Sequence, residues 1–242
     1  MRRMLTGLRA ALAAGAWCLA AAAPAQPVQA AQGLSENQIV QLAGQGRYDE
    51  LAQGLAGRER LPPGEQHALC HALAQTKHYR QLMACLDTLQ AVLKGRDRAS
   101  LLFGLDDATA TVYLMRAEAL LDLGQWAEAR AQAQAALDWF HKEGSAAERD
   151  LQAQALGLLA LAQVQLGEAG QARAALKQVQ AIPAGLGAGP NVAQQRTLAL
   201  ARGHLALGEY GPACAALESD KLFDFRRHVE VLLHGRPANW VW

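Results

Sequence analysis

Two histidines and two carboxylates are the side chains of this chain that are best suited to hold a metal ion. His67 and His71 are four residues apart, so a helix would carry both imidazoles on one face. Glu118 and Asp122 share this spacing on a later segment, and two imidazoles with two carboxylates are ligands that zinc accepts. The chain has no His-Glu-x-x-His motif, however. We therefore favour a solvated patch of histidines and acids, and we predict no metal and no cofactor.

Motifs for covalent catalysis and nucleotide binding are absent from the sequence. Gly185, Gly187 and Gly189 are close together, but no lysine follows them in a strand-to-helix unit, so they do not predict a phosphate-binding loop. No Gly-x-Ser-x-Gly motif is present either. Cys70 and His71 are neighbours in sequence, and on a helix their side chains would diverge. We expect a non-catalytic protein.

Cys70 and Cys85 are candidates for a disulfide bond. They lie seven residues before and eight residues after Lys77, so a helical hairpin that turns near Lys77 would bring them to similar heights. An exported protein allows such a bond. Two buried free thiols are the alternative, because helix axes pack about 8–10 Å apart, whereas disulfide-bonded Cα atoms are about 4.4–6.8 Å apart. Both alternatives stay open, and Cys214 would be the unpaired thiol.

Residues 1–30 have the layout of a secretory signal peptide. Three arginines lie among the first nine residues, and residues 10–23 form an apolar run without a charge. Small residues suited to cleavage follow, near Ala25 or Ala30. We predict that the mature protein is periplasmic or secreted, with an uncleaved membrane anchor as the alternative.

Charge and hydropathy narrow the classes of partner. Removal of the signal peptide deletes three arginines and no acidic residue, so the formal net charge moves from +1 to −2. A weakly acidic chain without a basic stripe is a poor candidate for binding nucleic acid. No later stretch is apolar over 18 or more residues, so we predict no membrane span after signal cleavage.

A short pattern occurs five times along the chain. It has a glycine or lysine, an aromatic residue two positions later, and a small or aliphatic residue three positions further on, with alanine in the aromatic place in one copy. The copies begin 31, 47, 43 and 41 residues apart, at Gly46, Lys77, Gly124, Gly167 and Gly208. Spacing on this scale predicts a stacked repeat protein. We expect each copy to mark the turn between two helices, because glycine is favoured just after a helix C-terminus.

Capping residues and connectors set the expected helix boundaries. Ser35 and Gln38 have the spacing of a capping box, which predicts a helix that starts there. Residues 61–64 are expected to form a linker before the next helix, and Asn191 is expected to cap a later helix. Beyond the last turn, residues 222–233 carry an apolar face that predicts a capping helix within 219–242.

The pattern resembles the tetratricopeptide repeat, which has small residues at its eighth and twentieth positions. Matches to the eighth position are Ala117, Ala160 and Ala201, matches to the twentieth are Leu82, Ala129, Ala172 and Ala213, and Pro183 lies near the terminal proline. The resemblance covers about residues 33–218, and its spacing of 41–43 residues is longer than the usual repeat of about 34. It implies an all-α protein: a right-handed α-solenoid of antiparallel helix hairpins over residues 31–218, with about five repeats and a C-terminal capping helix.

The resemblance also implies a binding surface. In this family the first helix of each pair lines a concave groove that binds a segment of another protein. The corresponding positions here are His67, His71, Leu114, Glu118, Leu121, Asp122, Gln154, Leu161, Val164, Gln165, Leu198, Arg202 and Leu205. The alternative is that the leucines among them pack between neighbouring helices.

We predict a non-catalytic scaffold that binds another protein or a peptide segment. One alternative is an adaptor in cell-envelope assembly. The other is a metal-binding protein or enzyme that uses His67, His71, Glu118 and Asp122.

Overall fold

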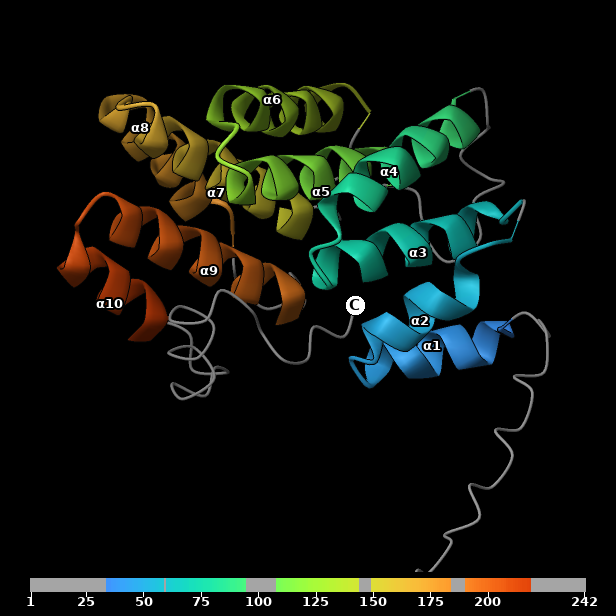
Figure 1. The fold of residues 1–242 in the computed structure, drawn as a ribbon. Helices are drawn as coiled ribbons and strands as arrows, with labels where there is room; N and C mark the ends of the chain where they lie inside the picture. The colour runs from blue at the N-terminus through green and yellow to red at the C-terminus, as the bar shows by residue number, and fades with distance from the viewer. Residues whose placement is uncertain (1–33, 59, 95–107, 144–148, 184–189, 219–242) are drawn as a thin grey trace, which may run out of the picture. The chain divides into compact units, whose positions relative to one another are not determined.

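The structure is a computed structural model that describes residues 34–58, 60–94, 108–143, 149–183 and 190–218. These residues form ten α-helices and contain no β-strand, so the expected all-α class is confirmed (Figure 1). The helices are α1 (Glu36–Gly44), α2 (Tyr48–Leu55), α3 (Pro63–Gln75), α4 (Tyr79–Leu93), α5 (Ala108–Asp122), α6 (Trp126–Glu143), α7 (Arg149–Gln165), α8 (Ala169–Ala181), α9 (Pro190–Ala206) and α10 (Tyr210–Glu218). The expected signal peptide and the expected capping helix and tail lie outside the described residues.

The helices are arranged in five pairs. In each pair, three residues separate the first helix, which has an odd number, from the second helix, which has an even number, and the two helices pack together. Each second helix also contacts the first helix of the next pair, and each first helix contacts the next first helix. The first helices α5, α7 and α9 therefore lie in sequence against one another, with α7 in the middle.

All five expected turns have the same backbone geometry. Their first residues adopt left-handed φ angles, at Gly46 (70°), Lys77 (58°), Gly124 (73°), Gly167 (79°) and Gly208 (74°). In the Gly124 turn, the Gly124 amide donates to the Leu121 carbonyl at 3.1 Å, and the Gln125 amide donates to the Leu120 carbonyl at 2.9 Å. The other four turns have the same two bonds, which together define a Schellman motif.

The rest of the repeated pattern follows from these turns. Its third residue is the first residue of each second helix. The residue three positions further on is at most 1% exposed in all five pairs, as Leu51, Leu82, Ala129, Ala172 and Ala213. The alanines matched to the eighth position of the repeat are fully buried, at Ala117, Ala160 and Ala201. The alanines among these residues therefore let neighbouring helix backbones approach closely.

Two helix starts differ from expectation because proline fits the first turn of a helix. The capping box at Ser35 is present, since the Ser35 amide donates to Gln38 Oε1 at 2.8 Å and the Gln38 amide donates to Ser35 Oγ at 3.4 Å. However, α3 begins at Pro63, inside the expected linker, and α9 begins at Pro190, so Asn191 lies within the helix and not before it. Proline at these positions needs no hydrogen-bond partner for its nitrogen.

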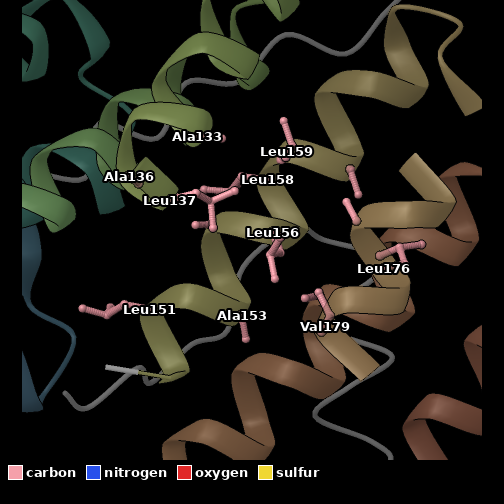
Figure 2. Close-up of a cluster of buried hydrophobic side chains, with 14 of the residues drawn as sticks. Ala133, Ala136, Leu137, Leu151, Ala153, Leu156, Leu158, Leu159, Leu176 and Val179 are labelled. Atoms are coloured by element: carbon pink, nitrogen blue, oxygen red, sulfur yellow. The ribbon is translucent and has the colours of Figure 1, made fainter. Parts of the chain in front are cut away.

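Helix α7 packs against its neighbours through leucine, alanine and glycine. Figure 2 shows side chains from α6, α7 and α8 gathered in one cluster, which includes Leu137, Leu158 and Leu176. On another face of α7, a Cβ atom added at Gly157 would lie 2.7 Å from the Cβ of Ala199 in α9. Only glycine at position 157 leaves room for α9 at this distance.

Candidate partner-binding face

Eight of the expected groove residues share one register on α5, α7 and α9. They lie six, three or two positions before the left-handed residue of the following turn: Glu118, Leu121, Asp122, Leu161, Val164, Gln165, Arg202 and Leu205. We call these residues the first-helix face. The four apolar members are half-buried, and the four polar or charged members are exposed. The face therefore combines partly accessible apolar side chains with charged ones.

Two of the other expected groove residues on these helices lie deeper. Leu114 and Leu198, each ten positions before its turn, are only 1% and 5% exposed. They belong to the packing between helices and are not available to a partner. For these two leucines, the alternative of packing between neighbouring helices is therefore confirmed. Gln154 is half-buried, and its Oε1 atom is buried without a hydrogen-bond partner. The accessible face is thus narrower than the resemblance implies.

An ion pair crosses the first-helix face. Glu118 Oε1 of α5 and Arg202 Nη1 of α9 are 3.9 Å apart, and both side chains remain about half exposed. Both residues lie six positions before their turns, and Leu161 holds the same position on α7, the helix packed between them. The charged ends of the two side chains therefore meet across the middle helix.

Asp122 is bound to the turn of the preceding helix pair. The Lys77 Nζ atom lies 3.0 Å from the Asp122 carboxylate, and the Tyr79 hydroxyl donates a hydrogen bond to it. Tyr79 is the turn aromatic of the α3–α4 pair, whereas Asp122 is the last residue of α5. Asp122 therefore links successive pairs, and much of its charge is compensated by Lys77.

His71 is buried and His67 is half-buried, so the expectation of a solvated patch is wrong for these two histidines. The His71 ring packs edge-to-face on Tyr48 with centroids 5.4 Å apart, and the His67 Nε2 atom is buried without a hydrogen-bond partner. Burial lowers the pKa of His67 from 6.5 to about 4, and burial together with the neighbouring His67 lowers the pKa of His71 to about 4. Both imidazoles are therefore neutral near pH 7.

The four candidate zinc ligands do not assemble. Within the described part of the chain, which includes all four residues, no group of three or more His, Cys, Asp or Glu side chains could hold a metal ion. Glu118 faces Arg202, Asp122 faces Lys77, and His71 packs on Tyr48. The arrangement therefore gives no support to the zinc constellation.

Cys70 of α3 and Cys85 of α4 form a disulfide. Their Cα atoms are 5.5 Å apart, so these two helices approach more closely here than typical helix pairs. Gln66 Nε2 donates to the Cys85 carbonyl at 3.4 Å beside the bond. Cys214 of α10 is a free and exposed thiol.

Sequence reasoning missed a pair of repeated ion pairs away from the first-helix face. Arg130 Nη1 lies 2.5 Å from Glu168 Oε1, and Arg173 Nε lies 2.6 Å from Glu209 Oε1. Each arginine is the fifth residue of a second helix, and each glutamate immediately precedes the next second helix. Hydrogen bonds from Arg173 and His204 lower the pKa of Glu209. The sequence did contain a signal for these ion pairs, because the arginines and the glutamates each hold the same position in consecutive copies of the pattern.

Comparison of the chain with protein-family models, with curated proteins and with solved structures finds no match. Among the helices formed by the described residues, none is long and apolar enough to cross a membrane.

Proposed function

We propose that residues 31–218 form a right-handed α-solenoid of the tetratricopeptide type, with five helix hairpins. The five Schellman turns and the contact of each first helix with the next support this proposal. Repeats that contact only their neighbours build extended surfaces, and such proteins use these surfaces to bind partners.

We further propose that the protein is a non-catalytic scaffold that binds a segment of another protein on the first-helix face. The observation that carries this proposal is the register of Leu161, Val164 and Leu205 with Glu118 and Arg202. Half-buried apolar side chains give a segment something to pack against, while the charged ones fix its orientation. This arrangement suits recognition of a partner, and it brings no nucleophile and base together.

We also propose that the scaffold acts in the periplasm or outside the cell. The signal-like layout of residues 1–30 supports export. The Cys70–Cys85 disulfide is consistent with it, because disulfides persist mainly in oxidising compartments.

Affinity capture with matched variants tests the proposed binding function. The mature chain is immobilised and exposed to the exported proteins of the source cells, and retained proteins are identified by mass spectrometry. We expect a defined protein on the unmodified chain and its loss from the Leu161→Asp/Leu205→Asp variant. The Leu93→Asp/Leu217→Asp variant is the control, because these leucines are also half-buried but lie on α4 and α10.

Circular dichroism of each variant separates lost binding from lost structure. The proposal stands if the face variant is folded and retains no partner while the control variant retains it. Equal retention by both folded variants would place binding elsewhere. A face variant that unfolds would show that these leucines are core residues, and the binding surface would then have to be sought on other helices.

A further inference from the structure

Glu118, Leu161 and Arg202 occupy the same position on three successive first helices. Each lies six residues before the left-handed residue of its turn, and α7 packs against both α5 and α9. Leu161 therefore lies in the middle of this row. The charged groups of Glu118 and Arg202 lie next to each other across α7, with Glu118 Oε1 and Arg202 Nη1 3.9 Å apart.

Among the residues that the structure describes, this ion pair differs from the other ion pairs between helix pairs. Arg130–Glu168 and Arg173–Glu209 each join one helix pair to the next. The Glu118–Arg202 pair joins the third helix pair to the fifth and spans the fourth. The distance between its two charged groups therefore depends on both contacts of α7, with α5 and with α9.

We propose that the Glu118–Arg202 pair is a latch that holds the first-helix face closed over Leu161 in the free protein. Opening of the latch exposes Leu161 and frees one carboxylate and one guanidinium on either side of it. The two side chains are 48% and 42% exposed, so the bond between them is weak and easily exchanged for other partners. A latch of this strength closes the face reversibly.

The latch concerns the face used in the proposed function, but it can be tested without any partner. A cysteine introduced by Leu161→Cys reports access to the middle of the row through its rate of reaction with an uncharged maleimide. The reporter is made in a Cys214→Ser background, because Cys214 is the exposed free thiol among the described residues, and the Cys70–Cys85 disulfide is kept oxidised. Failure of the latch and failure of partner capture are therefore seen in separate experiments.

We expect Glu118→Gln and Arg202→Gln each to accelerate the labelling of this reporter, by up to about five-fold, as suits an exposed ion pair. The charge-exchanged variant, Glu118→Arg with Arg202→Glu, is expected to restore the slow rate. Salt at about 1 M, where the Debye length is about 3 Å, is expected to accelerate labelling of the protein with an intact latch and to have little effect on Glu118→Gln.

The two single variants also separate the latch from a simple effect of charge on the thiol. Loss of the Glu118 carboxylate would lower the pKa of a nearby thiol and speed its reaction, whereas loss of the Arg202 guanidinium would do the opposite. A latch predicts acceleration by both. Arg130→Gln, which removes an ion pair from second helix α6, is the control and is expected to leave the rate unchanged.

Opposite changes in the two single variants, or no change in either, would overturn the proposal. If Leu161→Cys destabilises the protein, Val164→Cys provides a second reporter, since Val164 is half-buried on the same face of α7. The same pattern of rates is expected there.

Discussion

A single methyl group added at Gly157 tests how closely α7 packs against α9. The added Cβ atom would lie 2.7 Å from Ala199 Cβ and 3.1 Å from Ala199 Cα. Carbon atoms in good contact are about 3.5–4.0 Å apart, so Gly157→Ala forces the two backbones to separate. The Ala199 Cα atom cannot move aside as the end of a flexible side chain would.

Two opposing terms set the size of this effect. Alanine is favoured over glycine in a helix interior by about 0.8–1.0 kcal/mol. Overpacking a well-packed core costs about 1–3 kcal/mol, so we expect a net loss of about 0–2 kcal/mol in the free energy of unfolding. Gly170→Ala in α8 is the matched control, because nothing lies within 4 Å of its added Cβ atom. It is expected to stabilise the protein by at most about 1 kcal/mol.

Denaturant and thermal unfolding followed by circular dichroism measure the difference between the two variants. We expect Gly157→Ala to be less stable than Gly170→Ala by about 1–3 kcal/mol, and each kcal/mol corresponds to roughly 2–4 °C in Tm. Adding Ala199→Gly to Gly157→Ala removes the nearer contact and is expected to recover part of the loss. If Gly157→Ala and Gly170→Ala are equally stable, α7 and α9 do not approach this closely, and the stacking of first helices is wrong.

Three further predictions follow from the disulfide, the turns and the buried histidines. Replacing Cys70 and Cys85 by alanine is expected to lower the free energy of unfolding by about 2–4 kcal/mol, because the bond closes a loop with a sequence separation of 15; urea unfolding measures this. Gly167→Ala is expected to cost about 1–2 kcal/mol in the same assay; its φ is 79° and no atom lies within 4 Å of the added Cβ, so the cost comes from the left-handed backbone and not from a clash. His67 and His71 have folded pKa values of about 4 against an ordinary 6.5, so the unfolded chain binds more protons between these pH values. Their contribution to stability is full above pH 6.5 and falls toward pH 4, by at most about 1.4 kcal/mol per pH unit for each histidine, as unfolding at a series of pH values would show.

Each of these three predictions has a control variant, and a particular result with that variant would contradict the prediction. Cys214→Ser removes an exposed thiol, so a loss as large as that of the disulfide variant would point to general sensitivity to cysteine replacement. Lys77→Gly relieves the left-handed φ of 58° at the corresponding turn, so it should not destabilise the protein by more than the exposed ion pair with Asp122 is worth. His67→Gln/His71→Gln should flatten the pH dependence. An unchanged slope would assign it to other groups.

The turns could be predicted from the sequence because their signals are local. Glycine after a helix end favours the left-handed conformation, and Gly124, Gly167 and Gly208 adopt it as expected. Helix starts were harder to place, because Pro63 and Pro190 fit the first helical turn as well as a preceding linker.

The candidate site could be predicted only in part because its depth depends on distances between helices. The resemblance to the tetratricopeptide repeat assigned Glu118, Leu161 and Arg202 to one groove, but it gave no measure of how closely α7 and α9 pack. The contact at Gly157 is much closer than a typical helix contact, and the burial of Leu198 on α9 is a tertiary effect of the same kind. The expectation of a solvated histidine patch was wrong for a similar reason, because Tyr48 from the preceding helix pair packs on His71.

The helices that precede α5 and those that follow it are held together by different means. In α3 and α4, the buried polar side chains of Gln66 and His71 take up space that apolar side chains would otherwise fill, and the Cys70–Cys85 bond joins the two helices there. Between α7 and α9, glycine and alanine allow close backbone contact without a covalent link. Buried imidazoles oppose folding once they are protonated, whereas a contact between alanine and glycine does not depend on pH or redox state. Acid and reductant should therefore act first on α3 and α4, and α5, α7 and α9, which carry the first-helix face, should keep their packing longer.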